Sequence, residues 1–126
     1  MARNWSFLGS VFGGVAVAAG AFGAHGLKDH LSSEALAWWQ TGAQYQLAHA
    51  LALVLVGIVA ERRRSRAIEV AGTCFGLGIV LFSGSLFALA LSGVRMLGAI
   101  TPFGGLLLLA GWVALALAAR TPRTTA

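Results

Sequence analysis

The chain has 126 residues, of which 58% are hydrophobic and 10% charged, and its formal net charge is +5. Soluble domains carry about 25% charged residues, so this composition excludes a conventional soluble domain with a solvated surface. The composition indicates an integral membrane protein, and the length predicts one domain over residues 1–126.

Four long segments contain no Asp, Glu, Lys or Arg: residues 4–27, 35–60, 70–94 and 96–119. A helix of about 20 mostly apolar residues crosses a bilayer core of about 30 Å, so each segment is long enough to span. Backbone groups in lipid must be satisfied within the segment, which favours helices. We predict an all-α fold, an antiparallel up-down four-helix bundle in the membrane. The expected spans are residues 5–25, 39–60, 69–91 and 99–119.

The first segment has two interpretations. Arg3, an apolar run and the small residues Ala16, Val17 and Ala18 resemble a cleaved signal peptide. The apolar run continues well past that candidate cleavage site, whereas signal peptides have apolar regions of about 7–15 residues. We therefore expect a retained first helix.

Small residues are spaced for close helix packing. On a helix, Gly9, Gly13 and Gly20 share one face of the first span, and Gly72 and Gly76 share a face of the third. Small residues on one face let helices approach closely in lipid, so we expect these glycines at helix interfaces. The alternative is that glycine is simply frequent in membrane helices.

The connections between the spans differ in length. Ser32 or Ser33 can cap the second helix, which is then longer than a minimal span and projects into the outer interface or tilts. Residues 92–95 form a short connection, so the third and fourth helices are antiparallel neighbours. Thr101 followed by Pro102 predicts an N-cap with proline at the first helical position.

Basic residues predict the orientation of the bundle. With four spans, both termini and the middle loop lie on one side, and that side carries far more arginines than the other, which has Lys28 and Arg95. The basic residues on the terminal side are Arg3, Arg62, Arg63, Arg64, Arg66, Arg120 and Arg123. The positive-inside rule then places both termini in the cytoplasm, with the protein in the plasma or inner membrane. A basic run between apolar segments is typical of such a topology signal, so no nucleic-acid partner is expected.

Polar side chains gather in the half of the bundle away from the termini. If the second helix enters lipid near Thr41 and the third leaves it near Leu91, His49 and Ser83 each lie about 12 Å deep at 1.5 Å per residue. The candidate pocket comprises His49, Tyr45, Gln46, Thr41, Ser83, His25 and Arg95. Below His49 the same helix face is apolar, so the pattern predicts a pocket with an apolar floor rather than a pore.

Each candidate residue has a structural alternative. Ionisable groups within a membrane are functional candidates, but His49 can equally fix the bundle through interhelical hydrogen bonds of about 1 kcal/mol each. Ser83 can bond a carbonyl of its own helix. Arg95 can bind an anion such as a lipid phosphate or merely extend to the interface. The direction of His25 depends on whether Gly26 ends the first helix.

Catalytic and cofactor chemistry has little support. Cys74 is the single cysteine, which excludes an intrachain disulfide or a cysteine metal cluster. Haem ligation by His25 and His49 would have to join residues that differ in depth by about 10 Å. The sequence contains no HExxH motif and no Gly-rich phosphate loop. We expect no catalytic residues, no metal and no cofactor, and an enzyme is not favoured.

Several motifs follow one another along the chain: GAFGAHGL at residues 20–27, WQTG at 39–42, Tyr45-Gln46 with His49, LFSGSL at 81–86, TPFGG at 101–105 and Gly111-Trp112. In these motifs the chain resembles the YgdD-like family of small membrane proteins, classed as a domain of unknown function. The resemblance covers nearly the whole chain and implies a four-helix membrane domain with a retained first helix. It implies no reaction.

Two functions therefore stay open. The first is a multi-pass membrane protein whose outer pocket binds a lipid head group or a small polar solute. The second is a structural or assembly subunit of a larger membrane complex, packing through its glycine faces. The expected partners are membrane lipids, with a homo-oligomer or a membrane protein complex as alternatives.

Overall fold

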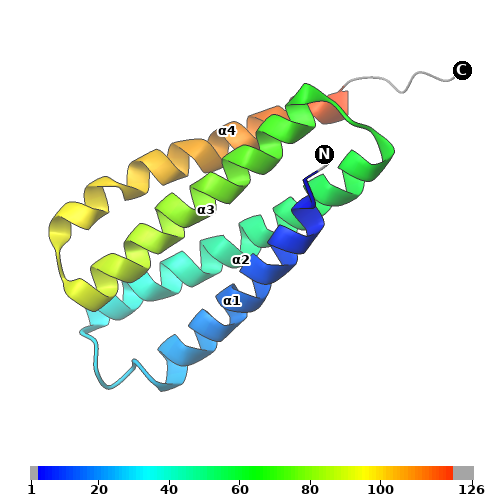
Figure 1. The fold of residues 1–126 in the computed structure, drawn as a ribbon. Helices are drawn as coiled ribbons and strands as arrows, with labels where there is room; N and C mark the ends of the chain where they lie inside the picture. The colour runs from blue at the N-terminus through cyan, green and yellow to red at the C-terminus, as the bar shows by residue number, and fades with distance from the viewer. Residues whose placement is uncertain (1–2, 121–126) are drawn as a thin grey trace, which may run out of the picture.

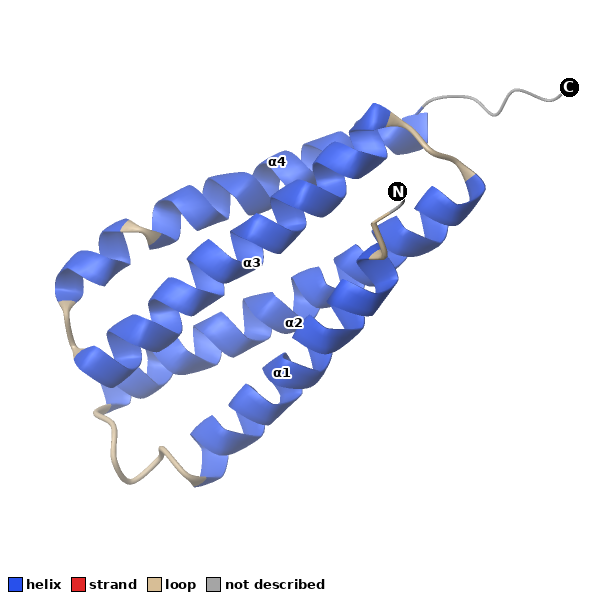
Figure 2. Cartoon of the chain, viewed as in Figure 1, coloured by secondary structure: helices blue, strands red, loops and turns tan. Residues whose placement is uncertain are grey.

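The computed structural model describes residues 3–120, which form α1 (Trp5–His25), α2 (Ser33–Arg62), α3 (Arg66–Ser92), the short 3-10 helix η1 (Arg95–Ala99) and α4 (Thr101–Arg120) (Figure 1). Within those residues the structure has helices and connections but no strand (Figure 2). All four long helices are long and apolar enough to cross a membrane. The predicted all-α four-helix membrane fold is confirmed; Arg123 lies outside the described residues.

The helices are arranged in chain order, each antiparallel to the next (Figure 1). The main packing interfaces join α1 to α2, α2 to α3, and α3 to α4, whereas α1 and α3 touch only slightly. In the most apolar 18-residue stretch of each span, 44% of the residues are buried in α2 and in α3. The share is 17% in α1 and 22% in the span formed by η1 and α4. The two middle helices therefore form the core, and the two terminal helices present most of their surface to lipid.

Side chains cap the helices at their N-terminal ends. Ser32 accepts a hydrogen bond from the backbone N–H of Ala35 at 3.1 Å, as expected for the predicted cap of α2. Ser65 caps α3 in the same way. At its other end α3 stops at Gly93, whose φ of 71° lies in the left-handed region that favours glycine. This turn returns the chain towards α4.

Thr101 differs from its expected role. It is the first residue of α4, and its hydroxyl lies 2.6 Å from the Ser85 hydroxyl of α3. The side chain therefore joins two helices in addition to starting one. Because Thr101 and Ser85 lie side by side, the start of α4 is level with the last third of α3.

The apolar core is divided between two clusters. The larger contains Leu53 and Val56 of α2 with Ile68 and Phe75 of α3, all almost completely buried. The smaller lies at the opposite end around Leu27, Trp39 and Ala90. Lipid, not water, surrounds the outer faces, so these contacts act through close packing more than through apolar burial from water.

Glycines allow the closest approaches between helices. A Cβ on Gly9 would meet the Ala50 carbonyl oxygen and Val54 N at 2.8 Å, and one on Gly72 would enter the Trp5 ring. A Cβ on Gly13 or Gly76 would make ordinary contacts at 3.7 Å, and Gly20 has nothing within 4 Å. The tightest α3–α4 contact is at Gly104, which packs against the Phe82 backbone. Gly104 belongs to the TPFGG motif, but its spacing in the sequence did not indicate a packing position.

Gly104→Ala is expected to lower the thermal stability of the purified protein. Its Cβ would lie 2.7 Å from Phe82 Cα, and backbone cannot rotate aside, so α3 and α4 would have to separate. Overpacking of this kind costs about 1–3 kcal/mol. Thermal unfolding in detergent, followed by tryptophan fluorescence, measures the loss.

Gly84→Ala is the matched control, because nothing lies within 4 Å of its Cβ. Alanine favours a helix over glycine by about 1 kcal/mol, so this variant should melt no lower than the parent protein. Equal melting temperatures for the two variants would contradict the proposed α3–α4 contact.

Candidate functional site

His49 lies at the centre of an aromatic cluster that joins three helices. Its ring is 5.7 Å from Trp112 of α4 and 5.8 Å from Phe75 of α3, measured between ring centroids. Tyr45, one turn earlier on α2, stacks nearly parallel to the imidazole at 6.1 Å and also contacts Phe82. The His49 side chain is only 7% exposed, so the cluster excludes lipid and water from the ring.

The hydrogen bonds of His49 define its tautomer. Nδ1 lies 2.7 Å from the Tyr45 carbonyl oxygen, which can only accept, so Nδ1 carries a hydrogen. Trp112 Nε1–H donates to Nε2 at 3.0 Å, and an indole can only donate, so Nε2 is unprotonated. Both ring nitrogens are used, and the imidazole is neutral in this arrangement. The geometry supports a positioning role in the bundle more directly than proton transfer.

The other buried candidates also bond to neighbouring helices. Gln46 Nε2–H donates to the Phe12 carbonyl of α1 at 2.9 Å. Ser83 Oγ–H donates across to the Gly42 carbonyl of α2 at 2.7 Å, rather than to its own helix. Every buried side-chain nitrogen and oxygen in residues 3–120 has a hydrogen-bond partner. These groups hold the bundle together without help from a ligand.

Trp39 belongs to the same set of interhelical donors. Its Nε1–H donates to the Ala19 carbonyl of α1 at 2.7 Å, and its ring packs on Gly23 and Phe87. Trp39 is therefore buried between the helices. Trp39 and Trp112 supply two polar contacts that sequence reasoning missed, because a tryptophan in an apolar run gives no sign of its indole partner.

The length of α4 gives a scale for the depth of His49 and its hydrogen-bond partners. This helix has 20 residues and is thus about 30 Å long, which matches the hydrocarbon core of a bilayer. Trp112 lies about 16 Å along α4 from Thr101. His49, bonded to Trp112, therefore lies level with the middle of α4.

A second group of candidates lies on the surface of α2. Tyr45 is 46% exposed, Thr41 is half-buried and Gln44 is exposed. Within residues 3–120 the Tyr45 hydroxyl and the side chains of Thr41 and Gln44 make no hydrogen bond. They lie close to Gly42, whose carbonyl accepts the hydrogen bond from Ser83 of α3. Ser83 is only two residues from Ser85, which pairs with Thr101 at the start of α4. These polar groups therefore lie in the outer half of the bundle, between the start of α4 and the level of His49.

Arg95 and His25 are farther from the His49 cluster. Arg95 Nη1 is 3.4 Å from the Glu34 carboxylate, and its guanidinium lies 5.7 Å from the centroid of the Trp38 ring. His25 is the last residue of α1, exposed, and Gly26 caps that helix as the sequence suggested. The structure does not bring His25 and His49 together. Among residues 3–120, no group of three or more His, Cys, Asp and Glu side chains is placed to hold a metal ion.

The model of the DUF423 family, which is described as a protein of unknown function, matches residues 19–105. The UPF0382 membrane protein of Staphylococcus haemolyticus is 45% identical over 86% of this chain and 88% of its own. YwdK, a UPF0382 membrane protein of Bacillus subtilis, is 42% identical over 89% and 92%. The UPF0382 inner membrane protein YgdD of Escherichia coli is 43% identical over 82% and 79%. No solved structure matches the chain. The expected resemblance to YgdD-like proteins is confirmed.

The His49–Trp112 hydrogen bond predicts a single histidine tautomer. Nitrogen NMR of the protein labelled at histidine should show His49 protonated at Nδ1 and unprotonated at Nε2. The exposed His25 and His30 side chains serve as internal references. Trp112→Phe removes the donor and is expected to release Nε2, giving a mixture of tautomers. The same variant should lose about 1 kcal/mol of stability. An unchanged His49 spectrum in Trp112→Phe would refute the assignment.

Proposed function

Since the chain belongs to the DUF423 family of membrane proteins, whose function is unknown, we propose that it is a non-enzymatic, lipid-binding membrane protein. Its outer half, defined as the end holding the α1–α2 connection and η1, binds the head group of a lipid or a small polar solute. The bound group lies on the surface of α2, not inside the bundle. The observation that carries the proposal is the division of the polar side chains into a bonded interior set and an unused surface set.

The interior set argues against a solute path through the bundle. Gln46 and Ser83 donate hydrogen bonds to carbonyls of neighbouring helices. His49 donates to the Tyr45 carbonyl and accepts a hydrogen bond from Trp112. A solute entering between the helices would have to break these bonds in a medium where an unpaired polar group is costly. Holding the helices in register is therefore the role assigned to this set.

The surface set supplies the proposed ligand contacts. Thr41, Gln44 and Tyr45 offer two hydroxyls and an amide on the outer half of α2. An exposed tyrosine is well suited to bind a lipid there, because its ring is apolar and its hydroxyl polar. The hydroxyl can donate to a phosphate or ester oxygen.

Arg95 and Glu34 form the mouth of the proposed site. Their side chains are 78% and 59% exposed, and an ion pair that exposed contributes about 0–1 kcal/mol. A phosphate can therefore take the place of Glu34 on Arg95 at little cost. The Trp38 ring beside Arg95 keeps the guanidinium at the interface.

Tyr45→Phe is expected to reduce the amount of lipid or small polar solute retained by the protein after purification in mild detergent. The variant removes one hydroxyl and preserves the ring contacts with His49 and Phe82. Loss of one hydrogen bond of about 1 kcal/mol predicts roughly fivefold weaker retention. Native mass spectrometry measures the bound mass. Leu51→Ala, at a lipid-exposed position farther along α2, is the control and should retain the parent level.

A structural role in a larger complex is the second candidate, supported by the outer surface of α1. A Cβ on Gly14 or Gly20 would meet nothing within 4 Å, so both glycines leave open notches where another helix can approach. Gly20→Leu should not disturb the monomer. If it abolishes co-purification with other membrane proteins while Tyr45→Phe leaves retention unchanged, the assembly role replaces the lipid-binding proposal.

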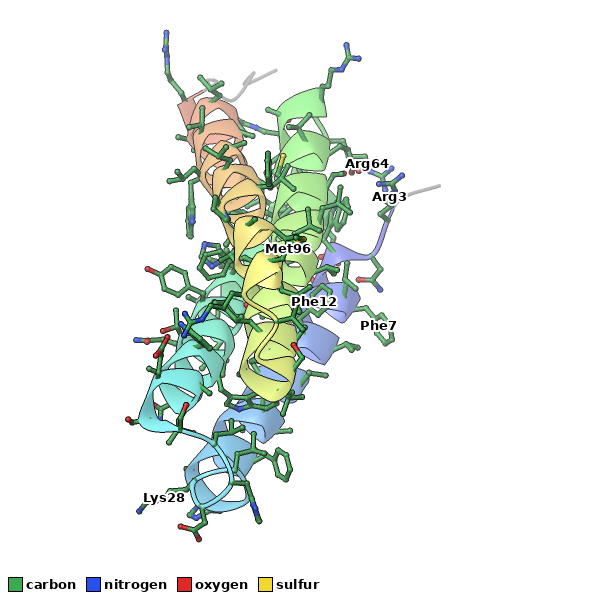
Figure 3. All side chains as sticks on the ribbon, turned by 90° about the vertical axis from the view of Figure 1, so that its left-hand side faces the viewer. Arg3, Phe7, Phe12, Lys28, Arg64 and Met96 are labelled. Carbon is green, nitrogen blue, oxygen red and sulfur yellow. The ribbon has the colours of Figure 1, made fainter. Side chains whose placement is uncertain are left out.

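The proposed orientation places both termini in the cytoplasm, supported by the positions of the basic residues. Figure 3 shows Arg3 and Arg64 at one end of the molecule and Lys28 at the other. Cytoplasmic loops are enriched in arginine and lysine, so the arginine-rich end, defined by Arg3, Arg62, Arg63, Arg64, Arg66 and Arg120, faces inward.

Cysteine labelling of intact bacterial cells tests this orientation. In a Cys74→Ser background, Lys28→Cys is expected to react with a membrane-impermeant maleimide without cell lysis. Arg64→Cys should react only after the membrane is permeabilised. Both positions are exposed, so burial cannot account for a difference. The reverse pattern would show that the termini face outward.

A further inference from the structure

An open cleft lies at the arginine-rich end, far from the residues of the proposed outer site. Its volume is about 390 Å³, and it is lined by Arg3, Arg66, Glu69, Val70, Thr73 and Cys74. Arg3 comes from the segment before α1, and the others lie on one face of the first turns of α3. Arg3 appears beside the α3 end of the bundle in Figure 3. The cleft therefore joins two parts of the chain that are far apart in sequence.

Trp5 fixes the wall from which Arg3 extends. Its ring is 4% exposed and lies against Gly72, where a Cβ would not fit. Trp5 Nε1–H donates to the Glu69 carboxylate at 3.4 Å. The Arg3 guanidinium is 5.7 Å from the Trp5 ring centroid and donates to Thr73 Oγ1 at 3.4 Å. Arg3 is thus held over the cleft and still has N–H groups to offer.

Arg66 is the second cation at the cleft, and it is unused. Within residues 3–120 it has no hydrogen-bond or ion-pair partner, and it is exposed. Glu69 is the single acidic residue lining the cleft, so the two guanidinium groups leave an excess of positive charge there. Guanidinium groups match the geometry of phosphate oxygens, which they bind through paired N–H donors.

The cleft continues into an apolar face of α3. At helical spacing, Val70, Thr73 and Leu77 follow Arg66 along the same side, and Val70 and Leu77 are 43% and 53% exposed. Cys74 lies about 12 Å along the helix from Arg66, so the cleft extends from the membrane surface into the edge of the hydrocarbon. A ligand with a charged head and an apolar chain fits both parts, whereas free phosphate would use only the first.

We propose that this cleft binds the phosphodiester head group of an anionic membrane phospholipid. Arg3 and Arg66 contact the phosphate oxygens, and an acyl chain lies along Val70 and Leu77. Basic pockets between membrane helices are suited to such head groups. The site is separate from the proposed outer site in position and in residues, so either can fail without the other.

Cys74 provides the readout, because it is the single cysteine and lines the cleft. The full-length protein is placed in nanodiscs of phosphatidylcholine, with or without phosphatidylglycerol, and the rate of Cys74 alkylation by a small maleimide is measured. Nanodiscs expose both faces, so the result does not depend on orientation. Phosphatidylglycerol is expected to slow the reaction, and phosphatidylcholine alone is not.

Two charge-matched double variants separate a site from general attraction. Arg3→Gln with Arg66→Gln removes two cleft arginines, whereas Arg64→Gln with Arg120→Gln removes two exposed arginines that do not line the cleft. Each arginine near a membrane surface raises the affinity for anionic lipid about fivefold. The cleft variant should therefore need roughly thirtyfold more phosphatidylglycerol for half-protection of Cys74. Arg66→Gln alone breaks no hydrogen bond or ion pair within residues 3–120. This single variant should need about fivefold more phosphatidylglycerol for half-protection, even if the double variant fails to fold.

Protection by phosphatidylglycerol that is lost in the cleft variants and kept in the control variant supports the proposal. Equal protection in both lipid mixtures, or equal loss in the two double variants, overturns it. A third arm adds soluble glycerol phosphate to nanodiscs of phosphatidylcholine. Full protection there would show that the ligand is a free phosphate compound, and the lipid proposal would then be wrong.

Discussion

The structure depends on hydrogen bonds from buried side chains to backbone carbonyls of the neighbouring helix. Trp39 and Gln46 donate to carbonyls of α1, and Ser83 donates to a carbonyl of α2. A helical carbonyl already accepts one bond and has a second lone pair available. In lipid an unpaired polar group is costly, so each of these donors must meet its carbonyl and the helices have little freedom to slide. Gly42 shows how packing and hydrogen bonding combine: it lets Phe87 approach and offers its carbonyl to Ser83.

The large features of the fold could be predicted because they depend on composition and local chemistry. Uncharged runs locate the helices, Ser32 and Gly26 mark two of their ends, and the placement of arginines gives the two ends different character. Gly9 and Gly72 were recognisable as packing positions because their spacing puts small residues on one face. These inferences need only one helix at a time.

The candidate site was predictable in its residues but not in its pairings. His49, Gln46 and Ser83 stood out because polar groups are rare in a span, yet nothing in the sequence connects His49 to Trp112 or Gln46 to the Phe12 carbonyl. A backbone acceptor has no residue type, and an indole in an apolar run resembles any other large apolar side chain. The distinction between bonded interior groups and the unused Tyr45 hydroxyl depends on how four helices are rotated about their axes. Small rotations of this kind leave little trace in hydrophobic periodicity.

The neutral form of His49 has a consequence for the response of the protein to voltage. Moving one elementary charge across the membrane potential changes the energy by about 2.3 kcal/mol per 100 mV. The central parts of the four helices contain no Asp, Glu, Lys or Arg, and the one deeply placed imidazole is held without charge by Tyr45 and Trp112. The transmembrane field therefore has no formal charge to act on within the bundle. Its charged groups are confined to the two surfaces, where they respond to lipid composition and ionic strength instead.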